Sequence, residues 1–310
     1  MSPTIPSHPR TIVAMPGSIE RVFVAGAGLM GHGIAQVHAA LGLAVVLYEP
    51  DLARAQAGRD RIAGNLDRAV GKGRLSAEDR EATLARIEAT DDTARAADAD
   101  LVVEAVFEEV AVKSALWRQL DAVAPAAAIF ATNTSSIAIH RLAEAVAAPR
   151  RERFVGMHFF SPVPVMPLIE LIRGRDTTDE TVEAVRGLAA AMGKQVIVST
   201  DRPGFIVNRI LMPFLAEAMR AFEEGIGTAE DIDAGARVGL NHPMGPLELA
   251  DFIGLDVCLG IMRVLDDGIG GDRFRPPRAL VELVAAGNLG QKTGQGFYTY
   301  PRPERTADGR

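Results

Sequence analysis

The stretch Arg21-Val-Phe-Val-Ala-Gly-Ala-Gly-Leu-Met-Gly31 determines how the rest of this sequence is interpreted. It opens with a short, mostly apolar segment and continues with glycines at positions 26, 28 and 31. The run from Gly33 to Leu41 then has helical spacing, and Ala44 to Tyr48 is a second apolar segment that ends beside an acid, Glu49. The order strand, Gly-x-Gly-x-x-Gly, helix, strand, acid predicts a dinucleotide-binding unit, whereas the glycine pattern alone would also fit a turn without a ligand.

The residues of this turn have separate expected parts. Gly26 permits the tight turn, Gly28 lets the backbone approach a pyrophosphate, and Gly31 lets helix and strand pack closely. Leu29 and Met30 lie between these glycines, and the positive N-terminal end of the following helix faces the phosphates. These five residues are therefore candidate cofactor-binding residues.

Glu49 indicates which dinucleotide is bound. It lies 18 residues past Gly31, where an acid accepts hydrogen bonds from the adenosine ribose. Because a carboxylate at this position repels a 2′-phosphate, the sequence favours NAD over NADP.

Composition excludes several classes of protein. The chain has 310 residues, of which 48% are hydrophobic and 24% charged, as in a soluble globular protein of two domains. The net charge of −7 and the lack of a dense Lys/Arg block argue against a nucleic-acid partner. No apolar run approaches the ~20 residues of a membrane span.

We expect no metal, because the single cysteine, Cys258, has no zinc-type Cys/His spacing around it. Residues 1–18 have no apolar core, so we expect a flexible leader of a cytoplasmic protein rather than a secretory signal.

Two further strands end in polar residues. Leu101 to Val106 predicts a buried parallel strand, and Glu108 and Lys113 follow it. Ligands bind at such strand ends, so both are candidates to flank a nicotinamide; the alternative is a helix-start acid and a surface lysine. Ala127 to Ala131 predicts the next strand, which leads into Thr132-Asn-Thr-Ser-Ser136. This turn suits a ligand or a helix N-cap, and we expect one serine to cap and the other to be free to bind.

Three basic residues lie at the C-terminal end of the helix predicted from Asp51 to about Gly73. They are Arg68, Lys72 and Arg74. A solvated basic face is the ordinary interpretation, and binding of an anionic substrate tail is the alternative.

The segment from Val155 to Leu171 carries one histidine and one acid in apolar surroundings. Its three prolines rule out a regular helix, so we interpret it as strand, loop, strand. Neighbouring strand ends could bring His158 and Glu170 together, and a carboxylate that holds the imidazole in one tautomer keeps it available as a general base. The alternative is a core histidine with an unrelated glutamate.

Alternating strands and helices predict an α/β fold with a Rossmann-type doubly wound sheet over residues 19–199. The last strand is expected at Lys194 to Val198, and residues 200–310 are expected to form an all-helical C-terminal domain. Asn208 near its start either pairs within the core or faces a cleft. The many apolar positions of this domain indicate a homodimer or ordinary core packing. Its predicted helices are Phe205 to Glu224, Ala229 to Val238, Leu247 to Leu265 and Pro277 to Ala286.

Together these features closely resemble the L-3-hydroxyacyl-CoA dehydrogenase family, in particular its short-chain 3-hydroxybutyryl-CoA type. The resemblance covers about Ile19 to Tyr300. It rests on Gly26-Ala-Gly-Leu-Met-Gly-His-Gly-Ile-Ala-Gln, Asn133-Thr-Ser-Ser, Gly156-Met-His-Phe-Phe-Ser-Pro-Val, Pro203-Gly-Phe-Ile-Val-Asn-Arg, Gly245-Pro-Leu-Glu-Leu-Ala-Asp and Lys292-Thr-Gly-Gln-Gly-Phe-Tyr.

The resemblance implies a role for each matching residue. His158 is the implied catalytic base, with Glu170 as its carboxylate partner. Ser135 is implied to touch the substrate's 3-oxygen, and Asn208 to bind a substrate oxygen. Lys72 is implied to lie near the CoA. The implied cofactor-lining residues are Glu108, Lys113, Asn133 and Lys292.

The implied reaction is NAD-dependent, reversible oxidation of an L-3-hydroxyacyl-CoA, as in β-oxidation, other fatty acid metabolism and butanoate metabolism. Two alternatives stay open. One is a dehydrogenase of a free hydroxy acid or sugar acid, as in the gulonate 3-dehydrogenase and λ-crystallin branch. The other is a non-catalytic NAD-binding structural protein. The Phe159-Phe160 pair and the Asn133-Thr-Ser-Ser turn favour the acyl-CoA branch.

Overall fold

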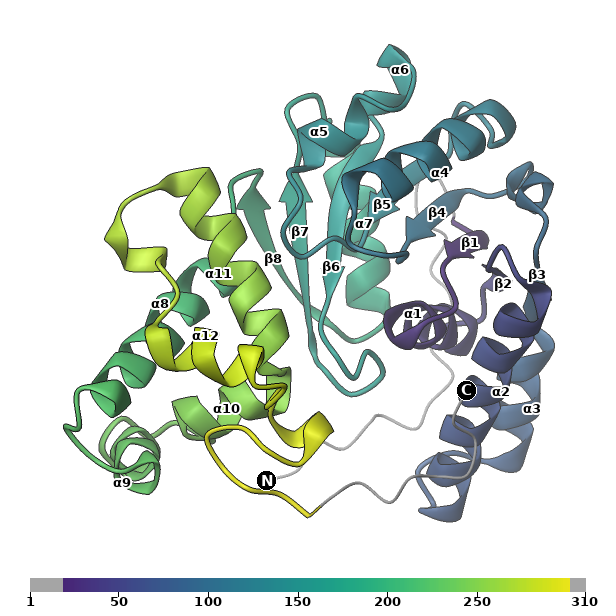
Figure 1. Cartoon of the computed structure of the whole chain (residues 1–310). Helices are drawn as coiled ribbons and strands as arrows, with labels where there is room; N and C mark the ends of the chain where they lie inside the picture. The colour runs from purple at the N-terminus through teal and green to yellow at the C-terminus, as the bar shows by residue number, and fades with distance from the viewer. Residues whose placement is uncertain (1–18, 302–310) are drawn as a thin grey trace. The chain divides into compact units, whose positions relative to one another are not determined.

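The computed structural model describes residues 19–301, so the leader predicted at residues 1–18 lies outside the described residues. The chain divides into two compact units, of which the first ends at Arg202 and the second begins at Pro203 (Figure 1).

An eight-stranded sheet with the order β3-β2-β1-β4-β5-β6-β7-β8 organises the first unit. Strands β1 to β6 run parallel, β7 is antiparallel to β6, and β8 is parallel to β7. Strands β2 and β4 lie on opposite sides of β1, so the strand order reverses at β1. Open α/β sheets bind ligands at such a reversal, beyond the carboxyl ends of the strands. The predicted α/β fold is confirmed. The strands are β1 (Arg21–Ala25), β2 (Ala44–Tyr48), β3 (Ile87–Thr90), β4 (Leu101–Glu104), β5 (Ile129–Thr132), β6 (Phe154–Phe159), β7 (Leu168–Arg173) and β8 (Gln195–Thr200).

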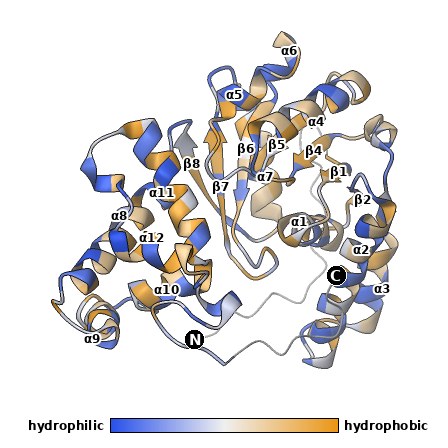
Figure 2. Cartoon of the chain, in the orientation of Figure 1, coloured by the Kyte–Doolittle hydropathy of each residue, from blue (hydrophilic) through white to orange (hydrophobic). Residues whose placement is uncertain are grey.

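Helices pack on both faces of this sheet. Apolar side chains of α1, α2 and α7 share one core with Val22 and Val24 of β1. On the other face Trp117 of α4 stacks on Phe130, with ring centroids 4.9 Å apart, and meets Phe154 edge-on. Figure 2 shows the central strands coloured as hydrophobic, as expected of strands buried on both faces. The helices are α1 (Leu29–Ala40), α2 (Leu52–Gly71), α3 (Ala77–Ala85), α4 (Val110–Val123), α5 (Ile139–Ala143), α6 (Ala148–Arg151) and α7 (Asp179–Ala191).

The second unit is built from helices around an apolar core. Met212, Leu215 and Met219 of α8 pack with Leu247 of α10 and Leu259 of α11. Its helices are α8 (Val207–Glu223), α9 (Ala229–Ala234), a π-helical turn (Gly235–Gly239), α10 (Pro246–Ile253), α11 (Leu255–Ile269) and α12 (Arg278–Ala285).

The secondary structure differs from the sequence-based expectations in two places. Strand β3 was not predicted, because its four residues, Ile-Glu-Ala-Thr, carry too weak a pattern. The single helix expected from Leu247 to Leu265 is two helices, α10 and α11, separated by Gly254. Gly254 has φ = +103°, a left-handed conformation that cannot continue an α-helix.

No helix within residues 19–301 is both long enough and apolar enough to cross a membrane.

Candidate active site

His158 and Glu170 face each other across the β6–β7 hairpin. The register of the two antiparallel strands pairs them directly, and His158 Nδ1 lies 3.1 Å from Glu170 Oε2. Both are buried, with 7% and 0% of their surface exposed. The contact predicted from the sequence is therefore confirmed. A carboxylate at Nδ1 holds the proton there and leaves Nε2 as the basic nitrogen.

Two neighbours join this pair to the rest of the site. The ring of Phe160 lies 4.5 Å from the imidazole of His158, measured between centroids. The side-chain oxygen of Asn133 accepts a hydrogen bond of 2.9 Å from the Phe159 amide. Asn133, expected to line the cofactor, thus fastens the turn after β5 to the strand that carries His158.

Glu108 organises the serine turn, which we define as residues 133–136. Its Oε1 atom accepts hydrogen bonds from the Thr134 hydroxyl at 2.6 Å, the Ser135 amide at 2.9 Å, and the Ser136 amide and hydroxyl at 3.0 and 2.9 Å. The Ser135 hydroxyl lies 3.4 Å from the same oxygen. The turn is therefore arranged around one carboxylate oxygen.

The expectation that one serine caps the next helix was wrong. Helix α5 begins at Ile139, and the carboxylate of Asp201 accepts hydrogen bonds from the amides of Ile139 and His140, each at 2.8 Å. The Thr134 hydroxyl accepts from the Ile137 amide at 2.9 Å. Asp201 lies more than 60 residues further along the chain, so no local pattern could have identified it as the capping residue.

Lys113 is neither a surface lysine nor an accessible one, since only 1% of its surface is exposed. Its ammonium group is 2.5 Å from Glu104 Oε1 and 3.3 Å from Glu108 Oε2. Sequence reasoning missed Glu104, although an acid that ends a buried hydrophobic strand is a usable signal.

Burial raises the pKa of Glu104, and Lys113 only partly offsets this. Partial burial also pushes the pKa of Glu108 upward, but Lys113 and the hydroxyls of Thr134 and Ser136 outweigh it, so this pKa lies below its usual value.

The glycine loop has the shape of a phosphate cradle. A Cβ atom at Gly31 would lie 1.7 Å from the Gly26 carbonyl oxygen, so helix and turn touch there. Gly26 has φ = +105°, and its Cβ would lie 2.5 Å from the carbonyl oxygen of Ala105. A Cβ at Gly28 would have nothing within 4 Å, and helix α1 begins beside it with no side-chain cap. Open space at the uncapped start of a helix fits a dinucleotide pyrophosphate.

Glu49 lies beside this loop. Its Oε2 atom accepts a hydrogen bond of 2.7 Å from the Ala27 amide. The acid expected to bind the ribose therefore directly follows β2 and contacts the glycine loop through the Ala27 amide.

The other predicted residues are placed as follows. Lys72 is exposed at the C-terminal end of α2. In the second unit, Asn208 is buried in the first turn of α8, with 7% of its surface exposed. Lys292 in that unit contacts Asp256 at 2.5 Å. The convergence of Asn208 with Ser135 and His158 stays a prediction.

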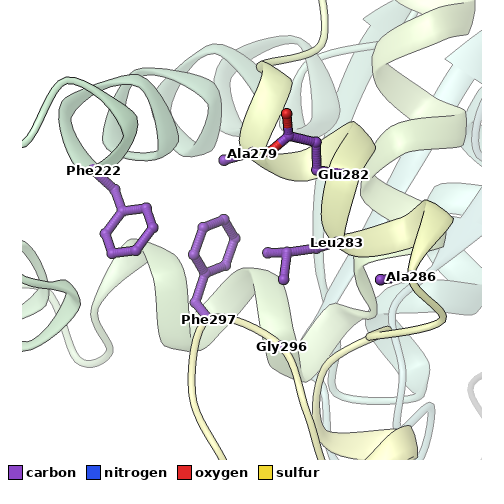
Figure 3. A pocket seen from close by; sticks show the side chains of 7 residues that line it. All are labelled: Phe222, Ala279, Glu282, Leu283, Ala286, Gly296 and Phe297. Atoms are coloured by element: carbon purple, nitrogen blue, oxygen red, sulfur yellow. The ribbon is translucent and has the colours of Figure 1, made fainter.

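A separate pocket of about 290 Å³ lies in the second unit (Figure 3). It is mostly apolar, with the rings of Phe222 and Phe297 meeting edge-on at 5.5 Å. None of the site residues predicted from the sequence lines it, so we do not assign the chemistry to it. Its lining residues are Phe222, Ala279, Glu282, Leu283, Ala286, Gly296 and Phe297.

Comparison with known proteins gives matches over nearly the whole described chain. The family model for the NAD binding domain of 3-hydroxyacyl-CoA dehydrogenase matches residues 21–202, and the model for the C-terminal domain of the same family matches residues 204–300. This chain is 50% identical over 286 residues to 3-hydroxybutyryl-CoA dehydrogenase from Bradyrhizobium diazoefficiens, which covers 92% of this chain and 97% of that one. It is 43% identical to 3-hydroxybutyryl-CoA dehydrogenase from Mycobacterium tuberculosis, covering 92% and 100%. Among solved structures, (S)-3-hydroxybutyryl-CoA dehydrogenase from Ralstonia eutropha has a TM-score of 0.89 at 44% identity, covering 92% of this chain and 100% of that one.

Proposed function

Because this chain belongs to the 3-hydroxyacyl-CoA dehydrogenase family, we propose that it reversibly oxidises a short-chain L-3-hydroxyacyl-CoA, of the 3-hydroxybutyryl-CoA type, to the 3-oxoacyl-CoA. NAD is the cofactor of the family, and the chain is an NAD-dependent oxidoreductase. The single observation that carries the chemistry is the buried contact between His158 and Glu170.

His158 acts as the general base in this proposal. Its Nδ1 donates to Glu170, so Nε2 accepts the proton of the substrate's 3-hydroxyl group. Glu170 then stabilises the imidazolium that forms, as the buried carboxylate of a hydrolytic triad does. Positioned acid–base catalysis of this kind contributes about 10²–10⁴-fold to rate. In the reverse direction the imidazolium returns the proton to the oxygen.

Ser135 and Asn208 position the substrate oxygen. Ser135 is supported by its place on the serine turn, which Asn133 ties to the strand of His158. Asn208 is buried in the first turn of α8 and lies at the position that the resemblance to the family implies for a residue that binds a substrate oxygen. Lys72 is proposed to meet the anionic part of CoA, since it is exposed and basic.

The cofactor is held by residues at the carboxyl ends of β1, β2 and β4. The glycine loop, with the amides of Leu29 and Met30, receives the pyrophosphate, and Glu49 receives the adenosine ribose. When bound, NAD accepts the hydride from C3 of the substrate. Glu108, Lys113, Asn133 and Lys292 are proposed to act around the nicotinamide; Lys113 does so through Glu108, because Lys113 itself is buried.

A single kinetic series tests this function. Purified protein is assayed for NADH oxidation with acetoacetyl-CoA, longer 3-oxoacyl-CoA substrates and free acetoacetate, with NADPH in parallel. We expect the highest kcat/KM with acetoacetyl-CoA and NADH. Turnover of free acetoacetate or of a sugar acid alone would instead favour the free hydroxy-acid alternative, and NADH binding without any turnover would favour a structural protein.

We also propose that the protein is a cytoplasmic homodimer that serves β-oxidation or butanoate metabolism. Apolar residues exposed on the second unit support the dimer, because association would remove their side chains from water. Light scattering coupled to size-exclusion chromatography tests it, and a mass of one chain would contradict it. The exposed residues are Ile210, Ile226, Val238, Leu240 and Phe252.

A further inference from the structure

Glu104, a residue with no part in the function proposed above, connects three elements at the end of β4. Its Oε1 atom accepts hydrogen bonds from the Lys113 ammonium at 2.5 Å and from the Val106 amide at 2.9 Å. Its Oε2 atom accepts from the Thr132 hydroxyl at 2.7 Å. One carboxylate therefore fixes helix α4, the segment after β4 and the last residue of β5.

These contacts continue into a closed ring. From Lys113 the ring passes to Glu108 Oε2 at 3.3 Å, and Glu108 Oε1 holds the serine turn through the amides of Ser135 and Ser136. The serine turn follows directly on Thr132, which returns the ring to Glu104. The turn is thus held at its start by Glu104 and at its end by Glu108.

Stability alone is a weak explanation for this arrangement. Glu104 and Lys113 are 0% and 1% exposed, and apolar side chains often replace such buried ion pairs without loss of stability. Buried charges are nevertheless present here, beside the proposed cofactor site, since the backbone of Ala105 touches the glycine loop at Gly26.

We propose that Glu104 is a positioning residue for the reaction: it holds Lys113, which holds Glu108, which in turn fixes the serine turn and the Ser135 hydroxyl. Glu104 acts through these groups and touches no reactant. This inference rests on the proposed function, because it takes Ser135 to contact the substrate oxygen.

The physical reason lies in how Lys113 is shared. With Glu104 neutralised, Glu108 would be the carboxylate that remains beside the Lys113 ammonium. Ammonium and carboxylate would then close on each other and draw Glu108 away from the serine turn. Displacements of about 1 Å in a catalytic group cost up to about 100-fold in rate.

The substitution Glu104→Gln tests this, because it keeps the shape of the side chain and removes its charge. We expect kcat for acetoacetyl-CoA reduction to fall about 10- to 100-fold, and the isotope effect with NADH deuterated at the transferred position to rise as hydride transfer becomes rate-limiting. The matched control is Asp121→Asn. Asp121, near the C-terminal end of α4, also accepts hydrogen bonds from a backbone amide, that of Ala147, and from a cation, Arg150. Arg150 in turn donates to the Ala128 carbonyl, which lies just before β5 and so at the opposite end of that strand from the serine turn. The Asp121→Asn variant should have a lower melting temperature than wild type but the same kcat and the same isotope effect.

A second variant separates positioning from an independent effect. Because Glu104 acts through Glu108, Glu104→Gln should slow a Glu108→Gln enzyme by less than about two-fold, since residues of one network are not additive. Full additivity, an unchanged kcat in Glu104→Gln, or the same isotope effect as Asp121→Asn would each overturn the proposal.

Amide hydrogen exchange gives a readout that does not depend on activity. The amides of Ser135 and Ser136 donate to Glu108, so a peptide over the serine turn should exchange at least about ten-fold faster in Glu104→Gln than in wild type or Asp121→Asn. Unchanged protection would overturn the ring, whereas a wild-type protein inactive on every acyl-CoA would overturn the proposed function instead. If Glu104→Gln does not fold, Glu104→Gln/Lys113→Gln removes both buried charges and should show the same fast exchange; wild-type protection there would count equally against the proposal.

Discussion

His158 and Glu170 are direct cross-strand partners, with Nδ1 and Oε2 3.1 Å apart across the β6–β7 hairpin. Directly opposed residues of an antiparallel pair have their side chains on the same face of the sheet. The backbone register, rather than a choice of side-chain rotamers, therefore brings imidazole and carboxylate together. If His158 is the base, as proposed, its imidazole needs little reorganisation before it accepts a proton.

Removal of the imidazole should separate catalysis from cofactor binding. In His158→Gln we expect kcat with acetoacetyl-CoA to fall about 10²–10⁴-fold, because the proposed base is lost. NADH affinity, followed by fluorescence titration, should change by less than about two-fold, since the glycine loop and Glu49 are untouched. A variant with the wild-type rate would show that another group is the base.

Gly28 should accept alanine in the fold but not in the cofactor complex. A Cβ at this position meets no protein atom within 4 Å, and φ = −69° suits alanine, so the melting temperature of Gly28→Ala should match that of wild type. The methyl group would occupy the space proposed for the pyrophosphate, and we expect NADH affinity to fall at least about ten-fold, or about 1.4 kcal/mol. Gly71→Ala is the control, because its Cβ is equally unobstructed at the end of α2. Equal NADH affinity in the two variants would refute this role of Gly28.

The charge of Glu49 should set the preference between the two nicotinamide cofactors. Glu49→Gln retains an oxygen that accepts from the Ala27 amide but no longer repels a 2′-phosphate. We expect the ratio of kcat/KM for NADH to that for NADPH to drop at least about ten-fold, mainly through a better KM for NADPH. The comparison requires both cofactors at the same ionic strength; a ratio that did not change would place the 2′-hydroxyl elsewhere.

His38 should make the fold sensitive to acid. Burial lowers the pKa of His38 from 6.5 to about 4, because the imidazole of this α1 residue is fully removed from water, which disfavours its charged form. The unfolded chain binds this proton below pH 6.5 and the folded chain only below about pH 4, so the free energy of unfolding falls as pH decreases across that range. At pH 4.5 the loss should be about 2–3 kcal/mol relative to pH 7, at 1.36 kcal/mol per pH unit.

Urea unfolding at pH 7 and pH 4.5 measures this loss. His38→Leu does not titrate and should lose about 2–3 kcal/mol less than wild type between the two pH values. His242→Gln is the control, because it removes an exposed histidine instead of the buried one. Parallel pH profiles for wild type and His38→Leu would contradict the prediction.

Gly254 should be the residue that separates α10 from α11. At φ = +103° an alanine side chain is strained, and we expect Gly254→Ala to destabilise the fold by about 1–2 kcal/mol. Gly260→Ala, within α11 and with open space around its Cβ, should instead be neutral or stabilising by up to about 1 kcal/mol. Thermal unfolding of both variants checks the pair, and equal stability would mean that the φ value of Gly254 carries no strain.

The sequence by itself determined most of the sheet, the glycine loop, and a strand-loop-strand segment that could bring His158 and Glu170 together. Strands that are buried on both faces have to be apolar runs, which can be recognised in the sequence. A glycine that the backbone conformation requires can likewise be recognised from a single position. The prolines between residues 158 and 170 excluded a helix, so a hairpin remained. In each of these cases the physical cause acts within a few residues of the chain.

Only the tertiary structure decided what the polar residues at the strand ends contact. From the sequence, Glu104 could only be read as part of a strand, and the contacts of Glu108 and Lys113 could not be read at all. Their contacts depend on β4 and β5 lying side by side. The cap of α5 comes from Asp201, and both serines, one of which was expected to cap this helix, donate hydrogen bonds to Glu108. A buried charge takes whichever partner the fold brings within hydrogen-bonding distance, and that partner can lie tens of residues away. Spacing along the chain cannot encode such a choice, because register and packing of distant segments make it.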